Sequence, residues 1–193
     1  MQLFSRFVGS GIAAITSSLV VMQLAVAPSV QAEEITCTGS IGAVRVDNLR
    51  VPQGATCTLN QTIVQGTIKV EANATLKASR IQVVGNVQGE NAKQVNVLSR
   101  SFVGGSIQLV QGGSARIETV QINGDLLFDE NVSSLIASRN TIGGSLQAFK
   151  NTGGVTISAN TIDGNLQCKE NVPAPTGGEN IVQGNKEDQC AAL

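Results

Sequence analysis

The sequence of 193 residues contains no histidine, tryptophan or tyrosine, and aromatic residues make up only 3% of it. After residue 32 the aromatic side chains are Phe102, Phe128 and Phe149. The missing histidine removes the commonest general base of enzymes and a frequent metal ligand. A conventional globular core normally uses more aromatic side chains. Abundant glycine, asparagine, valine, isoleucine and glutamine instead favour a narrow core of stacked aliphatic side chains.

Charged residues are few and scattered along the chain. The first 32 residues hold one basic residue, Arg6, and no acid, so the remainder has 12 basic and 14 acidic residues, a net charge of −2. Proteins that bind nucleic acids need a concentrated basic face, so we expect no nucleic-acid partner. No block of like charge suggests attachment to a membrane surface.

Residues 1–32 have the organisation of a secretory signal peptide. Arg6 precedes a mostly apolar, acid-free stretch from Val8 to Ala27, and Val30-Gln31-Ala32 supplies small residues for signal peptidase. A retained membrane anchor is the alternative, but Gly, Ser, Thr and Gln dilute the apolar stretch. We therefore expect an exported protein that is periplasmic, on the cell surface or secreted. Residues 33–193 would form one domain with no membrane span.

All four cysteines, Cys37, Cys57, Cys168 and Cys190, lie after residue 32. Paired cysteines of exported proteins usually form disulfides. A metal site is the alternative, but no two cysteines have CxxC spacing and histidine is missing. We therefore expect disulfides, no metal site and no cofactor.

The strongest pattern is a repeat marked by a column of glycines, separated by 19, 20, 19, 20, 20 and 20 residues. A β-branched residue stands two positions before each glycine. An aliphatic residue stands two positions after it in six of seven repeats, and Lys186 is the exception. The column consists of Gly66, Gly85, Gly105, Gly124, Gly144, Gly164 and Gly184. A repeat at such a fixed period is typical of a solenoid.

Apolar residues two positions apart lie on the same face of a strand. Each repeat fits two or three short strands joined by turns rich in Gly, Asn and Ser. The sequence therefore predicts an all-β, single-stranded parallel β-helix of seven to eight coils. The alternative, an antiparallel sandwich, predicts hairpins about every 8–12 residues and no identical columns one repeat apart.

Asparagine recurs in two further columns, which we predict to be hydrogen-bonded ladders within turns. The first column contains Asn73, Asn91, Asn131, Asn151 and Asn171, with Gly112 in place of one member, and the second contains Asn140, Asn160 and Asn180.

The cysteines fall at the two ends of the predicted stack. Stacked residues about 4.8 Å apart lie within the Cα separation that a disulfide accepts. We predict the pairs Cys37–Cys57 and Cys168–Cys190, each spanning about one coil. An N-terminal cap is expected over 33–57, coils over 58–184, and a C-terminal cap over 185–193, where charge replaces the apolar column.

The columns resemble the parallel β-helix repeats of exported bacterial proteins, over about Cys37 to Cys190. Stretches such as Ile122-Asn123-Gly124-Asp125-Leu126 carry this resemblance. It implies a β-helix, usually right-handed, and says little about function. The rhythm of Gly66-Thr67-Ile68-Lys69-Val70 is also similar to that of bactofilins, which stack end to end into filaments and are generally cytoplasmic.

Polysaccharide lyases and hydrolases on β-helices use carboxylates of neighbouring coils, and Asp125, Asp129 and Glu130 are the candidates here. Catalysis needs a carboxyl group of raised pKa in a walled cleft, which an open ridge does not supply. We interpret the charged residues that precede the first asparagine column as a surface charge ladder. This ladder consists of Glu90, Glu130, Lys150 and Glu170.

A flat polar strip is expected beside the glycine column. It contains Asn86, Ser106, Asp125, Ser145 and Asn165, and next to them Gln88, Gln108, Gln147 and Gln167. Such a strip suits a repetitive ligand, such as a glycan or an envelope surface, and a merely solvated face is the alternative. We predict a non-enzymatic exported structural or adhesive module. A polysaccharide-active enzyme and a protein that assembles with itself end to end are the alternatives.

Overall fold

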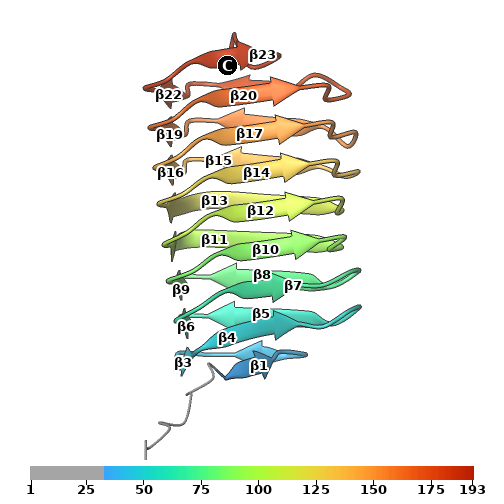
Figure 1. Ribbon diagram of the computed structural model, residues 1–193, viewed down its shortest axis with the longest axis vertical. Helices are drawn as coiled ribbons and strands as arrows, with labels where there is room; N and C mark the ends of the chain where they lie inside the picture. The colour runs from blue at the N-terminus through green and yellow to red at the C-terminus, as the bar shows by residue number, and fades with distance from the viewer. Residues whose placement is uncertain (1–32) are drawn as a thin grey trace, which may run out of the picture. The chain divides into compact units, whose positions relative to one another are not determined.

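The computed structural model describes residues 33–193, and these form a parallel β-solenoid of about seven turns without helices (Figure 1). The predicted signal peptide, residues 1–32, lies outside the described residues. None of the described elements is a helix able to cross a membrane.

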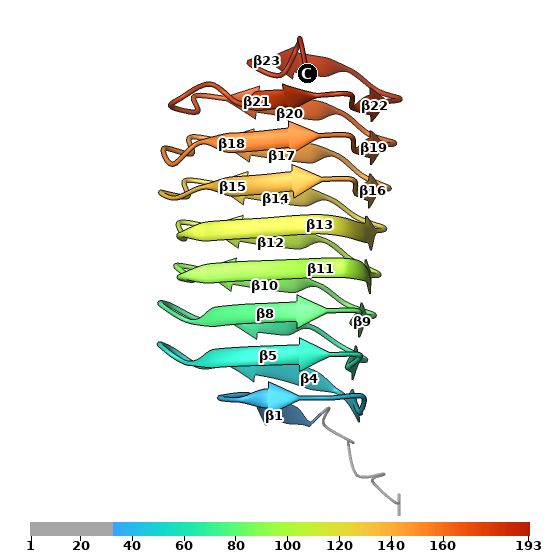
Figure 2. The ribbon, with the colours of Figure 1, turned by 180° about the vertical axis from the view of Figure 1, so that it is seen from behind.

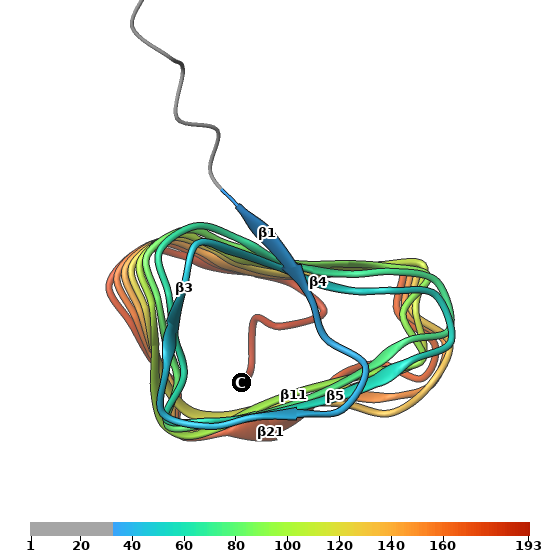
Figure 3. The ribbon, with the colours of Figure 1, turned by 90° about the horizontal axis from the view of Figure 1, so that it is seen from below.

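Each turn of the chain contributes strands to three faces, which give the solenoid a roughly triangular cross-section (Figure 3). Face A is the outer surface of a nine-stranded sheet: β1 (Glu34–Thr36), β4 (Asn48–Val51), β7 (Ile68–Val70), β10 (Val87–Glu90), β12 (Ile107–Val110), β14 (Leu126–Asp129), β17 (Leu146–Phe149), β20 (Leu166–Lys169) and β23 (Lys186–Asp188).

Face B lies behind it and consists of β2 (Ser40–Ile41), β5 (Thr56–Asn60), β8 (Thr75–Ser79), β11 (Gln94–Val103), β13 (Ser114–Ile122), β15 (Leu135–Ser138), β18 (Val155–Ser158) and β21 (Thr176–Gly178) (Figure 2). Face C is narrow, and the ends of β11 and β13 also reach it. Its other strands are β3 (Arg45–Val46), β6 (Ile63–Val64), β9 (Gln82–Val83), β16 (Thr141–Ile142), β19 (Thr161–Ile162) and β22 (Ile181–Val182).

Every strand pairs in parallel with its equivalent one coil away. On face A, Leu49 pairs with Ile68 and Leu146 with Leu166, so the coils advance by 19 or 20 residues, as the glycine column predicts. The strands of face A run rightwards in Figure 1 while the chain rises, and those of face B return behind them. The winding is therefore right-handed.

The predicted aliphatic columns form the core. Six of the seven β-branched residues that precede the glycines are buried and pair in register from coil to coil on face C. They are Val64, Val83, Val103, Ile122, Ile142 and Ile162. The seventh, Val182, lies in the last coil and is partly buried. Stacking is what allows narrow coils to bury apolar surface that a single coil leaves in water.

The glycine column marks the corner between faces C and A, where successive coils approach closely. A Cβ on Gly144 would lie 2.2 Å from Asp125 Oδ1 and 2.9 Å from the carbonyl carbon of Gly124, so no side chain fits. One side-chain oxygen per coil accepts a hydrogen bond from the backbone N–H of the next coil. These oxygens belong to Asn48, Thr67, Asn86, Ser106, Asp125, Ser145 and Asn165.

The structure confirms two asparagine ladders, each in the last coils. Asn131, Asn151 and Asn171 lie at the corner between faces A and B, and Asn140, Asn160 and Asn180 at the corner between faces B and C. All six are buried, and each Nδ2 donates to a backbone carbonyl of an earlier coil. A residue of positive φ precedes every one of them, which turns the asparagine inward.

Asn73 and Asn91 do not belong to the first ladder, and that part of the prediction is wrong. Both are exposed and have positive φ, and the buried residues that follow them are Ala74 and Ala92. Strand register therefore places the exposed Asn91 in line with Glu130, which stands one position before the ladder. Glu90 likewise stands in the register of Asp129, so it is not part of the predicted charge ladder.

Both predicted disulfides are present. Cys37 and Cys57 have Cα atoms 5.5 Å apart, and those of Cys168 and Cys190 are 5.2 Å apart. Parallel pairing continues into the segments expected to be caps, because β1 pairs with β4 and β23 with β20. Two disulfides are typical of an oxidising compartment outside the cytoplasm.

Candidate functional site

Four glutamines form a column on face A, as the sequence predicts. Gln88 pairs in register with Gln108, and Gln147 with Gln167, while Leu127 takes the place between the two pairs. Gln88 Nε2 donates to Gln108 Oε1 at 3.4 Å, and Gln147 Nε2 donates to Gln167 Oε1 at 2.9 Å. Each amide keeps further donors and acceptors directed away from the sheet.

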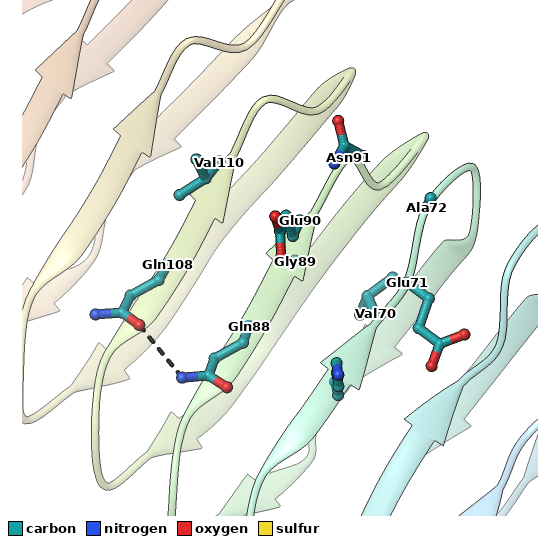
Figure 4. Close-up of a pocket in the computed structure, with 10 residues that line it drawn as sticks. Val70, Glu71, Ala72, Gln88, Gly89, Glu90, Asn91, Gln108 and Val110 are labelled. Carbon is teal, nitrogen blue, oxygen red and sulfur yellow. Dashed lines mark hydrogen bonds between the residues drawn. The ribbon is translucent and has the colours of Figure 1, made fainter.

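A shallow depression of about 610 Å³ lies over the N-terminal part of this column (Figure 4). Its outward side chains come from three successive coils. They are Lys69, Glu71, Gln88, Glu90, Gln108 and Val110. Figure 4 shows the Gln88–Gln108 hydrogen bond crossing from one coil to the next. The depression is open on the solvent side, so it suits part of a long ligand better than an enclosed small molecule.

The acids around this depression are partly engaged. Glu71 Oε1 lies 3.4 Å from Arg50 Nη1, and Glu71 Oε2 accepts a hydrogen bond of 3.0 Å from the backbone of Gln53. Arg50 also contacts Glu34 at 2.9 Å. These pairs hold the rim of the depression in place, and the amides of Gln88 and Gln108 lie between them as uncharged polar groups.

The predicted catalytic carboxylates do not converge. Asp125 stands at the corner between faces C and A, and its Oδ1 accepts a hydrogen bond of 2.7 Å from the backbone of Ser145. Asp129 ends strand β14, four residues later, so the two Cα atoms lie about 13 Å apart along an extended strand. Asp125 therefore serves the corner, and it does not form a pair with Asp129.

Glu130 has the wrong electrostatics for an acid catalyst. Its carboxylate accepts a hydrogen bond of 2.9 Å from Gln111 and lies 3.5 Å from Lys150 Nζ. The Gln111 hydrogen bond, followed by that of Lys150 and its charge, lowers the pKa of Glu130. A general acid needs the opposite shift. Lys150 and Glu130 do form the expected surface ion pair.

No metal centre is evident within residues 33–193, where no three side chains of the ligating types come together. Most residues of the predicted polar strip that lie next to the glycine column already use their side chains in hydrogen bonds within the protein. Asn86, Ser106, Ser145 and Asn165 use their side-chain oxygens to bind the backbone of the next coil. Of the whole strip, Gln88 and Gln108 are the residues that face solvent and line the depression.

Sequence reasoning missed a basic surface on face B. Arg80, Arg100 and Arg139 each have positive φ, directly precede a buried corner residue and are exposed. They are spaced by one and two coils, so a search for charges at the repeat spacing finds them. The surface escapes inspection of the linear sequence because single cations some 20 residues apart look scattered.

Comparisons with known proteins give no further guide, since no protein-family model, curated protein or solved structure matches this chain significantly.

Proposed function

We propose that this chain is a non-enzymatic exported module that binds a neutral, hydroxyl-rich polymer, such as a glycan of the cell envelope, along face A. The glutamine column beside the open depression is the observation that carries the proposal. Within each of its two pairs, Gln88–Gln108 and Gln147–Gln167, the amides stand one coil spacing of about 4.8 Å apart, and each can donate to or accept from a hydroxyl group.

The rigid scaffold supports binding of a long ligand. The glutamines stand on strands that pair with a neighbour on both sides, so the backbone beneath the side chains is already ordered before the ligand arrives. A preorganised surface loses little entropy on binding, which offsets the weakness of each single hydrogen bond. Affinity would then grow with the number of sugar units in contact.

The proposed setting is the periplasm, the cell surface or the medium. The two disulfides support an oxidising compartment, and residues 1–32 have the pattern of a secretory signal. The resemblance to exported bacterial β-helix repeats agrees with this setting, whereas the cytoplasmic bactofilins share only the rhythm of the coils.

The test is a panel of neutral and acidic oligosaccharides and polysaccharides, incubated with purified protein and followed for both binding and cleavage. Gln88→Ala/Gln108→Ala is expected to weaken binding of the neutral ligands about tenfold, because two amides leave the contact. Thr58→Ala/Thr156→Ala removes two polar side chains from face B and should leave this binding unchanged.

Cleavage of any polysaccharide that is abolished by Asp129→Ala would refute the proposal in favour of an enzyme. Failure of every neutral glycan to bind would also refute it. Self-assembly is a second candidate, because β1 and β23 end the nine-stranded sheet with one neighbour each. Light scattering at rising protein concentration decides it: growing rods support assembly along the axis, and a constant monomer mass excludes it.

A further inference from the structure

Face B carries a continuous groove across four coils, separate from the depression on face A. Two shallow hollows, of about 620 and 330 Å³, share Arg80, Asn96 and Leu98 in their walls, so they join into one channel along the axis. The channel crosses β5, β8, β11 and β13, whose order is visible in Figure 2. We call it the basic groove.

Strand register places the lining of the groove. Thr58, Lys77, Asn96 and Arg116 pair one above another and alternate with buried residues, so their side chains point outward. A parallel column two residues further on consists of Asn60, Ser79, Leu98 and Glu118. Cations, amides and one apolar side chain therefore share a surface that is straight and ordered.

An extra residue in β11 shapes the side of the groove next to face C. The register shifts between Leu98 and Ser101, and both intervening residues, Ser99 and Arg100, have φ of 60°. Such a bulge bends its strand and redirects side chains. Arg100 and, one coil below, Arg80 thus line the channel from its edge, and Arg80 Nη2 donates to Asn60 at 3.0 Å.

The groove concentrates positive charge. Five cations stand on or beside it, namely Lys77, Arg80, Arg100, Arg116 and Arg139, against one carboxylate, Glu118. Glu118 is paired with both Arg116 and Arg139, and its side chain is only 15% exposed. The other described residues hold seven cations and thirteen acids. A domain of net charge −2 thus has one groove with an excess of four positive charges on and beside it.

We propose that the basic groove binds a carboxylated polysaccharide. This ligand differs from the neutral polymer proposed for face A. Arginine guanidinium groups recognise carboxylates with two parallel hydrogen bonds, and the groove offers them from successive coils. Asn60, Asn96, Ser79 and Thr119 supply partners for sugar hydroxyls, and Leu98 supplies an apolar contact for a ring face. No aromatic side chain lines the groove to stack unpaired bases, which argues against a single-stranded nucleic acid.

The test is titration calorimetry of the purified protein with oligogalacturonate, with neutral dextran oligosaccharides and a short duplex DNA as comparisons. Oligogalacturonate is expected to bind, with affinity that falls as salt rises because exposed charges are screened. Lys77→Gln/Arg100→Gln should weaken it about tenfold, because two of the cations in contact are lost. Neither residue has an ion pair within residues 33–193, so the fold should be unaffected, which thermal unfolding checks.

Arg45→Gln/Lys169→Gln is the matched control, since it removes the same charge from faces C and A. An equal loss of affinity in this control would overturn the proposal, because the effect would then be one of net charge. Tighter binding of DNA than of oligogalacturonate would also overturn it. The glutamine variants of face A should leave oligogalacturonate binding unchanged, so each of the two proposals can fail without the other.

Discussion

The first and last coils share one backbone path but fill its corners differently. At the corner between faces A and B, the earlier coils bury Ala74, Ala92 and Gly112, where the later ones bury asparagines. The corner between faces B and C holds Thr62, Ile81, Ser101 and Val120 before its own asparagines begin. At both corners and in both halves, a residue of positive φ directly precedes the buried corner residue. One turn geometry thus accepts either small or apolar side chains or a column of hydrogen-bonded amides.

The difference between the halves separates two roles of a corner residue, which are to form the backbone turn and to stabilise it. Because the turn forms without asparagine in the first half, the ladder does not create it. In the second half the amides bind carbonyls and N–H groups of adjacent coils, and Asn151 for example links three turns of the chain. The C-terminal coils should therefore depend on single polar side chains in a way that the N-terminal coils do not.

The largest effect should come from Asn151→Ala. Asn151 Oδ1 accepts from the backbone and side chain of Asn131, both at 3.0 Å, and its Nδ2 donates to Phe128 O at 3.0 Å and Asn171 Oδ1 at 2.8 Å. Removing it leaves buried groups without partners, which should cost about 4 kcal/mol of unfolding free energy in urea. Asn91→Ala, at the exposed position, should cost about 0.5 kcal/mol. Equal losses would contradict the ladder.

Removal of the disulfides should cost about 3 kcal/mol each by the chain-entropy estimate, since both close a loop of about one coil. Hydrogen exchange should then distinguish the ends. In Cys168→Ala/Cys190→Ala, Gln189 still accepts from Asn171 and continues the first ladder, so exchange in β20 should rise little. In Cys37→Ala/Cys57→Ala no ladder holds β2 to β5, and exchange there should rise more. A larger rise of hydrogen exchange in β20 than in β2 and β5 would contradict this difference between the two ends.

The corner between faces C and A should show no difference between the halves. A Cβ at Gly85 would meet Gly66 O at 2.6 Å, and one at Gly144 would meet Asp125 Oδ1 at 2.2 Å. Each Gly→Ala change is expected to cost about 2 kcal/mol because backbone must move. Gly42, with no atom within 4 Å, is the control and should tolerate alanine. Unequal costs at Gly85 and Gly144 would show that the halves differ here too.

A smaller, stabilising effect is expected from Ala159→Gly. Ala159 is exposed and has φ of 55°, a region that disfavours every side chain with a Cβ. Glycine removes that strain without losing a contact, so thermal unfolding should show a gain of about 1 kcal/mol at the melting temperature. Ala137→Gly, buried in β15, should instead destabilise the protein. A loss at Ala159 would mean that the turn is not strained.

The sequence predicted the fold well because stacking repeats every inward position at the same spacing. The glycine column, the aliphatic columns and the Cys37–Cys57 pair follow from that spacing, whereas Cys168 and Cys190 are 22 residues apart and pair by a small shift in the last coil. Asn73 and Asn91 were misplaced because repeats of 19 and 20 residues shift the alignment by one position, and a hydrophilic residue gives no sign of burial. The basic groove was missed because its cations are isolated in the sequence, and the extra residue in β11 that brings Arg100 to it has no local signature.

Glu130 stands where the two halves meet, directly before the first ladder asparagine, and it gives the smallest effect. The hydrogen bond from Gln111, and then Lys150, lowers the pKa of Glu130 in the folded protein. Its contribution to stability is therefore present above the ordinary pKa of glutamate and is lost as pH falls through the lowered value. Gln111→Ala and Lys150→Ala should each raise the pKa of Glu130 towards the ordinary range, because each removes a contact that favours the carboxylate. Carboxyl NMR titration measures both shifts. Gln88→Ala, remote on face A, should leave the pKa of Glu130 unchanged. If Gln111→Ala left the pKa of Glu130 unchanged, the Gln111 hydrogen bond would not link the first coil of the ladder to the coil before it.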